Sequence, residues 1–173
     1  MPGISSAPPL NAQRVVVGVS DMTVSNNLRA VLSTYALGSC VGVVGYDPVA
    51  RVGGMLHFML PEAALVPAKA ALQPAMFGDS GLDAMLRAML GLQAVPNRLR
   101  FLIAGGASML GGQDSFKIGH RNVQAALGFF STHGFPAPRS IVGGQLNRTL
   151  HLDIGSGSVA LKSPNTNETY SLV

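Results

Sequence analysis

Short apolar runs separated by glycine and polar residues cover most of this chain, a pattern typical of β-strands. Within the run at 148–154, apolar and polar residues alternate, so Leu150, Leu152 and Ile154 share one face. The runs predict strands over residues 14–19, 29–37, 41–46, 53–60, 99–106, 148–154 and 158–162. We expect a turn over 20–27 and a hairpin between the last two strands.

Two other segments carry their apolar residues at helical spacing. In residues 79–92 one face collects Leu82, Met85, Leu86, Met89 and Leu90. Asp79 or Ser80 is the expected N-cap of this helix. The second helix is predicted over 121–133 and ends at Gly134, because glycine readily takes the left-handed conformation that stops a helix.

Two helices among mostly antiparallel strands predict a layered α/β or α+β fold. A chain of 173 residues is long enough for one domain with a substantial core. We expect a Pro- and Ser-rich flexible arm over residues 1–13, a single domain over 14–163 and a polar tail over 164–173.

Composition narrows the partners and the compartment. The formal net charge is +4, which suits binding to nucleic acid or to an acidic protein surface. The basic residues are scattered without a basic run, and this distribution argues against nucleic-acid binding. No apolar stretch is long enough to span a membrane, and residues 1–14 lack the features of a signal peptide. A single cysteine excludes an internal disulfide, so a cytoplasmic location is expected.

That cysteine, Cys40, lies in a predicted hairpin with His57. If Asp47–Ala50 forms the turn between the two strands, Cys40 and His57 face each other directly, and a slip of two residues makes them diagonal neighbours. Gly42 and Gly53 on the same face would leave open space beside the pair.

An imidazole beside a thiol can take its proton and later protonate a leaving group. Backbone N–H groups around Gly38, Ser39 and Cys40 are candidate donors to an oxyanion. From the residues alone, the group that orients His57 could be any of four side chains: Thr34, Ser33, Asp47 or Tyr46. A purely structural role for Cys40 and His57 explains the sequence equally well at this point.

Several motifs together resemble the chemoreceptor glutamine deamidases of bacterial chemotaxis, the CheD family. These motifs are LGSCVGVVGYDP, VGGMLHFMLP, AGGASML, FKIGHRNVQAAL and VGGQLNRTLHLDIGSGSVALK, and they extend over about residues 14–162. One departure is visible: the closing loop usually reads Gly-Gly-Asn-x-Gly-Arg, whereas this chain has Gln145 and Asn147 at the Asn and second Gly positions.

The resemblance implies a three-layer α/β/β sandwich similar to the catalytic domain of cytotoxic necrotizing toxins, with a Cys–His–Thr triad. Carried over by position, Cys40 is the nucleophile, His57 the general base and acid, and Thr34 the residue that orients His57. Arg121, Asn122 and Gly144 are then candidate substrate contacts, although Arg121 and Asn122 fit the first turn of a helix at least as well.

The resemblance also implies partners. The substrates would be methylation-site glutamines on the cytoplasmic helices of chemoreceptors, with glutamyl methyl esters as a second substrate, and a CheC-type phosphatase would be a further partner. No cofactor is expected, and His120, His133 and His151 lack metal-ligand spacing. Two alternatives remain: a non-catalytic adaptor that binds receptors or the phosphatase, and a cysteine peptidase or amidase, which would need a longer cleft.

Overall fold

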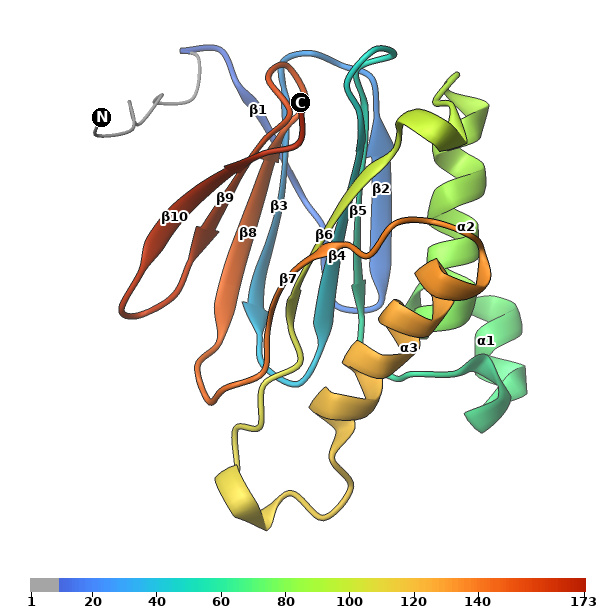
Figure 1. Ribbon diagram of the computed structural model, residues 1–173, viewed down its shortest axis with the longest axis vertical. Helices are drawn as coiled ribbons and strands as arrows, with labels where there is room; N and C mark the ends of the chain where they lie inside the picture. Colours follow the sequence, from blue (N-terminus) through green and yellow to red (C-terminus); the bar gives the residue numbers. More distant parts are fainter. Residues whose placement is uncertain (1–9) are drawn as a thin grey trace.

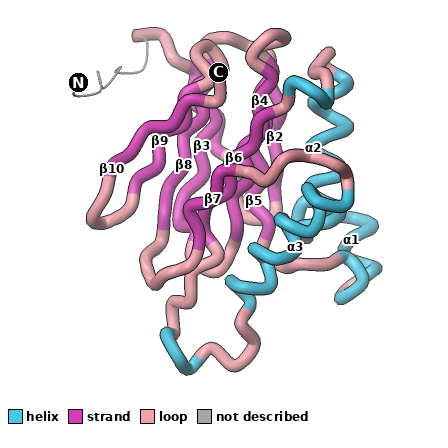
Figure 2. The backbone as a smooth tube through the Cα atoms, viewed as in Figure 1, coloured by secondary structure: helices cyan, strands magenta, loops and turns pink. Residues whose placement is uncertain are grey.

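Two five-stranded sheets pack face to face, and helices cover the outer side of one of them (Figures 1 and 2). The computed structural model describes residues 10–173. The outer sheet has the order β1 (Gln13–Val16), β3 (Ala30–Leu37), β8 (Arg148–Asp153), β9 (Ser158–Lys162) and β10 (Asn167–Ser171). The central sheet has the order β2 (Asp21–Ser25), β5 (Val52–Phe58), β4 (Val41–Asp47), β6 (Arg100–Gly105) and β7 (Arg139–Val142).

The helices are α1 (Pro67–Leu72), α2 (Gly78–Gly91) and α3 (Ile118–Thr132). Short 3-10 turns lie at Ala63–Leu65, Pro74–Met76, Pro96–Arg98 and Gly111–Gln113. The pairs β1–β3 and β6–β7 are parallel, and the other strand pairs are antiparallel. The layers therefore run helices, central sheet, outer sheet, which confirms the predicted α/β/β sandwich.

Each side of the central sheet has its own core. Toward the helices, Leu82, Met85 and Met89 of α2 pack on the sheet, as the helical spacing predicts. Toward the outer sheet, the side chains of Leu150 and Leu152 fill the space between the two sheets. Strands β4 and β5 are buried along their whole length, because both of their faces are covered.

Several boundaries differ from the sequence prediction. The predicted turn at 20–27 contains strand β2, which pairs with β5 at the edge of the central sheet. The N-cap of α2 is Phe77 instead of Asp79 or Ser80, because the carbonyl of Phe77 already accepts the N–H of Gly81, so the helix begins before Asp79. The Asp79 carboxylate accepts the N–H groups of Ala63 and Ser80. The predicted end of α3 is confirmed, since the helix stops at Thr132 and Gly134 has φ +74°.

The last ten residues were expected to be a polar tail, but they contain β10, which pairs antiparallel with β9. Leu172, just beyond this strand, is buried in the core between the sheets. The polar residues of the strand face solvent while this apolar residue anchors the end of the chain. The predicted N-terminal arm falls largely outside the described residues.

The register of the β4–β5 hairpin differs by two residues from the predicted one. Asp47 pairs with Val52 and Gly42 pairs with His57, so Cys40 and His57 are diagonal neighbours instead of directly opposed. Two features of the turn explain the shift. The Asp47 carboxylate accepts the N–H groups of Val49 and Ala50 while its backbone stays in the strand, and Arg51 closes the turn with φ +54°.

Candidate active site

The site lies where the chain crosses from the outer sheet to the central sheet, between β3 and β4 (Figure 1). A register irregularity follows Thr34 in β3, and Ala36 has φ +56°, so the chain turns sharply before Cys40. The crossover therefore brings the end of strand β3 and the start of strand β4 together around the cysteine.

Thr34 and His57 come from different sheets and meet between them. The side chain of Thr34 is fully buried and that of His57 almost so. Thr34 Oγ1 lies 2.7 Å from His57 Nδ1 and 2.7 Å from the carbonyl oxygen of Val17. Because a hydroxyl has one proton and a carbonyl can only accept, Thr34 donates to Val17 and accepts from His57. This assigns the ring proton to Nδ1 and leaves a lone pair on Nε2, the form that acts as a base.

Nε2 of His57 is buried and has no hydrogen-bond partner among residues 10–173. Cys40 lies diagonally across the β4–β5 pair from this ring, half-buried at the edge of the core between the sheets. Burial raises the pKa of the Cys40 thiol, and burial lowers the pKa of His57 to about 4. The resting pair is therefore a neutral thiol and a neutral imidazole at neutral pH, and the proton moves only when the thiol reacts.

The main-chain groups of Gly38, Ser39 and Cys40 divide into those already hydrogen-bonded within the protein and those that could bind an oxyanion. The carbonyls of Gly38 and Cys40 accept the N–H groups of Ala107 and Gly106, which fixes the turn against the loop after β6. The N–H of Gly38 is bonded to the carbonyl of Ala36, so it is not available to an oxyanion. Among residues 10–173, the N–H groups of Ser39 and Cys40 donate to no main-chain carbonyl, so these two remain the candidate oxyanion donors.

The predicted substrate contacts separate in the structure. Arg121 is exposed on α3, and Gly144 is exposed in the loop between β7 and β8, where its carbonyl accepts the N–H of Ser108. Arg148 holds this loop by donating to the carbonyls of Gly143 and Gly105. Asn122 is fully buried, and its side chain donates to the carbonyls of Ser39 and Met59.

A cleft of about 640 Å³ opens beside this region, between α3 and the glycine-containing loops after β6 and β7. Gly106, Ser108, Lys117 and Gly144 are among the residues that line it, and Cys40 is not. The cleft therefore adjoins the crossover turn through Gly106, whose N–H is bonded to the Cys40 carbonyl.

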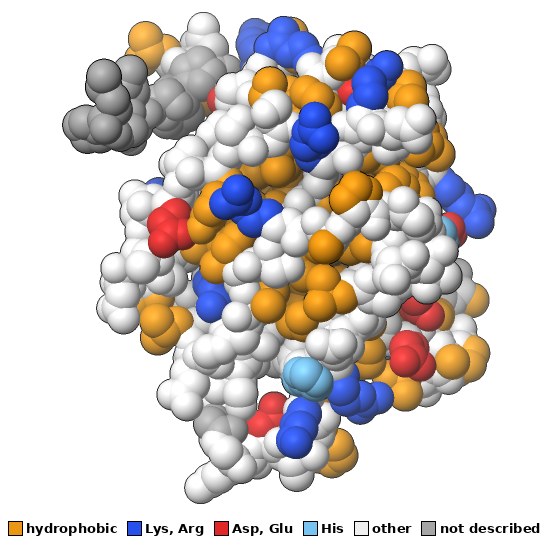
Figure 3. All heavy atoms as spheres, in the orientation of Figure 1, with side chains coloured by type: hydrophobic (Ala, Val, Ile, Leu, Met, Phe, Trp, Pro, Cys, Tyr) orange, Lys and Arg blue, Asp and Glu red, His pale blue; other side chains and the backbone are white. Residues whose placement is uncertain are grey.

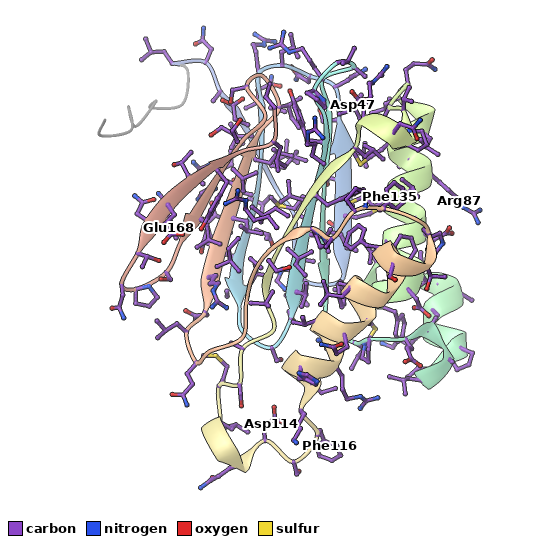
Figure 4. The ribbon with its side chains drawn as sticks, viewed as in Figure 1. Asp47, Arg87, Asp114, Phe116, Phe135 and Glu168 are labelled. Atoms are coloured by element: carbon purple, nitrogen blue, oxygen red, sulfur yellow. The ribbon has the colours of Figure 1, made fainter. Side chains whose placement is uncertain are left out.

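Three of the four candidate orienting groups lie elsewhere. Ser33 faces the opposite side of β3 and bonds His151 Nδ1 at 2.7 Å. Asp47 is buried at the far end of the strands, away from the loop that carries Asp114 and Phe116 (Figure 4), and pairs with Arg98 at 2.9 Å. Tyr46 donates its hydroxyl to the carbonyl of Ile154. Thr34 is the candidate that contacts His57.

The expected open space beside Gly42 and Gly53 is absent. A Cβ at Gly42 would lie 2.9 Å from carbons of Leu37 and Leu150, and one at Gly53 would lie 2.4 Å from Ile154. These glycines let side chains of the outer sheet approach the central sheet closely. They therefore serve packing between the sheets and leave no room for a ligand there.

Sequence reasoning missed the carbonyl of Val17, which fixes the proton of Thr34. Every residue has a carbonyl group, so no sequence signal could have identified it.

No group of His, Cys, Asp and Glu side chains among residues 10–173 has an arrangement that could hold a metal ion. Within the same range, no helix is long and apolar enough to cross a membrane. Lys and Arg side chains are spread over the viewed face without gathering into one patch (Figure 3).

The structure thus combines two packed sheets with a hydrogen bond between Thr34 and His57 and a half-buried cysteine, Cys40, diagonally across the β4–β5 pair from His57. A family model described as "CheD chemotactic sensory transduction" matches residues 59–163. The chain belongs to the CheD family. The matched segment begins just after His57, so it includes Asn122 and Gly144 but none of the three triad candidates.

Individual relatives match over more of the chain. A protein of Syntrophus aciditrophicus named "Probable chemoreceptor glutamine deamidase CheD 1" is 41% identical over 149 residues, which cover 86% of this chain and 93% of that protein. A "Probable chemoreceptor glutamine deamidase CheD" of Solibacter usitatus is 42% identical over 150 residues, covering 87% and 89%. Among solved structures, the hypothetical protein YfiH of Bacillus licheniformis aligns with a TM-score of 0.40 at 13% identity, over 72% of this chain and 49% of that chain.

Proposed function

We propose that this protein is a chemoreceptor glutamine deamidase that converts receptor glutamine side chains to glutamate through a cysteine thioester. The hydrogen bond between Thr34 and His57 carries the proposal, because it leaves Nε2 of His57 unprotonated, as a base for the Cys40 thiol must be. Membership of the CheD family and the printed names of the relatives support the choice of substrate.

In the first half-reaction, Cys40 transfers its proton to His57 Nε2 as its sulfur attacks the carboxamide carbon of the glutamine. The N–H groups of Ser39 and Cys40 stabilise the oxyanion of the tetrahedral intermediate. His57 then gives its proton to the departing nitrogen, ammonia leaves, and a thioester joins the substrate to Cys40.

In the second half-reaction, His57 takes a proton from water as the water oxygen attacks the thioester carbon. The carbon–sulfur bond breaks, the sulfur regains a proton from His57, and the product is glutamate. The sum of the two halves is one glutamine and one water converted to one glutamate and one ammonia. A glutamyl methyl ester would give the same thioester, with methanol leaving in place of ammonia.

We therefore propose that this chain acts in the cytoplasm, on the cytoplasmic helices of methyl-accepting receptors. Its net charge of +4 suits binding to acidic helices. A CheC-type phosphatase is the further proposed partner. Adding such a phosphatase from the same organism should slow deamidation, and an unchanged rate at saturating phosphatase would contradict this partnership.

The deamidase proposal is tested by incubating the protein with a purified cytoplasmic fragment of a chemoreceptor. Each converted glutamine raises the fragment mass by about one dalton and releases one ammonia by the chemistry above. Cys40→Ala should abolish both signals while the unfolding temperature stays close to that of the wild type, because the thiol is only half-buried. Deamidation retained in Cys40→Ala would refute the mechanism, and a folded wild-type protein without deamidation would leave the adaptor alternative.

A further inference from the structure

The side chain of Asn122 connects two segments that lead to the catalytic pair. Asn122 lies in the first turns of α3, is fully buried, and donates from Nδ2 to the carbonyls of Ser39 and Met59, both at 3.0 Å. Each of its two N–H groups therefore serves one carbonyl. The orientation of the amide follows from these contacts, because a flipped amide would place its oxygen against two other carbonyl oxygens.

These two carbonyls lie just beyond the end of the β4–β5 ladder. The last paired residues are Val41 and Phe58. After Phe58 the chain turns away, and the N–H groups of Met59 and Leu60 donate to the carbonyl of Met76. The amide of Asn122 thus bridges the two strands where their own hydrogen bonds stop. Ser39 directly precedes Cys40, and Met59 is two residues after His57.

Helix α3 itself packs closely against the loop after β6, which is hydrogen-bonded to the crossover turn. A Cβ at Gly119 would lie 2.5 Å from the carbonyl oxygen of Ala107 and 2.7 Å from that of Gly106. The N–H groups of these same two residues bond the carbonyls of Cys40 and Gly38. The helix that carries Asn122 is therefore joined to the crossover turn through Gly106 and Ala107.

The other end of the Asn122 amide argues against a role in stability alone. Its Oδ1 is buried and finds no hydrogen-bond partner in the part of the chain that the structure describes. A buried acceptor without a partner is unfavourable, and an apolar side chain of similar volume would avoid it. What an apolar side chain would not do is hold the carbonyls of Ser39 and Met59 at a fixed separation.

We propose that Asn122 is a positioning residue, which sets the distance between Cys40 and His57 by bridging the carbonyls of Ser39 and Met59. The catalytic part of its test rests on the proposed deamidase function. Asn122 acts on these two residues through the main chain, by its hydrogen bonds to the carbonyls of Ser39 and Met59.

The first test replaces Asn122 with leucine, which has a similar volume and no polar atoms. We expect kcat for deamidation to fall by about 10²-fold with a much smaller change in KM, since misplacing the reacting groups affects the chemical step more than binding. Tyr46→Phe is the matched control, because it also removes a buried bond from a side chain to a carbonyl, at the far end of the sandwich. It should lower the unfolding temperature and leave kcat unchanged. An unchanged kcat in Asn122→Leu would overturn the proposal.

The second test needs no deamidase activity. Cys40 is the only cysteine, so its rate of alkylation by iodoacetamide as a function of pH reports the thiol alone. Wild type should react at lower pH than His57→Ala, because the imidazole assists loss of the thiol proton. Asn122→Leu should shift toward the His57→Ala profile, and Tyr46→Phe should match wild type.

An Asn122→Leu profile identical to that of wild type would refute positioning, even if deamidation were lost. If wild type shows His57-dependent alkylation but no deamidation, a shifted Asn122→Leu profile still supports positioning while the proposed function fails. Should Asn122→Leu not fold, Asn122→Ala carries the same two readouts.

Discussion

Two adjacent hydroxyl side chains, Ser33 and Thr34, each bond a histidine at 2.7 Å, but on opposite faces of strand β3. Thr34 points between the sheets, where its histidine, His57, lies beside Cys40. Ser33 points to the other face of the outer sheet, where its partner is His151. Residues that follow one another along a strand alternate between its faces, so one step in sequence separates the candidate site from a similar pair outside it.

This pair of bonds allows a matched prediction. Thr34→Val leaves the carbonyl of Val17 and Nδ1 of His57 buried without a partner, so we expect a loss of about 1–3 kcal/mol in stability and roughly a hundredfold fall in kcat. Ser33→Ala should lower stability modestly and leave kcat near that of wild type. Deamidation kinetics and thermal unfolding of the two variants check this. Equal losses of kcat would show that general destabilisation, and not the orientation of His57, is responsible.

At the scale of elements, helix α3 decides how the crossover turn is supported. Its N-terminal part touches the loop after β6 at Gly119, whereas a Cβ at Gly128 in the same helix would point into open space. Glycine is therefore required for close packing at position 119, whereas position 128 has room for a side chain.

Alanine at these two glycines should have opposite effects. Gly119→Ala places a methyl group against the backbone oxygens of Gly106 and Ala107, which cannot yield as a side chain could, so we expect a loss of about 1–3 kcal/mol and reduced deamidation. Gly128→Ala should stabilise the protein by up to about 1 kcal/mol, because alanine favours the helix, with activity unchanged. Urea unfolding of both variants measures the difference, and a neutral Gly119→Ala would contradict the close packing of α3.

For the whole molecule, buried titratable groups connect stability to pH. Burial lowers the pKa of His57 to about 4, and burial together with the charges of Arg14 and Lys162 lowers that of His151 to about 4. Burial alone would raise the pKa of Asp47, but the Arg98 guanidinium and the N–H groups of Ala50, Val95 and Val49 lower it to about 2. All three groups bind protons more weakly in the folded chain than in the unfolded chain.

We therefore expect stability to fall on acidification in two stages. Between about pH 6.5 and pH 4 the unfolded chain takes up protons that folded His57 and His151 do not, and His57 alone accounts for on the order of 3 kcal/mol. Below about pH 4 the contribution of Asp47 is lost as the pH falls toward 2. Urea unfolding at a series of pH values measures this, and His57→Gln should flatten the first stage in part. A constant free energy of unfolding from pH 7 to pH 4 would contradict the burial of these histidines as neutral rings.

The sequence by itself determined the two long helices, most of the strands and their inward faces, but it missed strands β2, β7 and β10 and the short helix α1. Met85 and Leu152 are buried as their spacing predicts, because helical and strand periodicity are local properties of the chain. It also placed Cys40 and His57 on neighbouring strands, but it missed the register by two residues, since the conformation of Arg51 in the turn has no clear signal in its side chain.

Only the tertiary structure decided which of the candidate groups meet. Thr34 and His57 are 23 residues apart and belong to different sheets, so their contact depends on how the two sheets pack. The same packing filled the space beside Gly42 and Gly53 and buried Asn122 under the crossover turn. Periodicity tells which side of an element faces inward, whereas the partner on that side is set by the simultaneous packing of three layers, which no local pattern encodes.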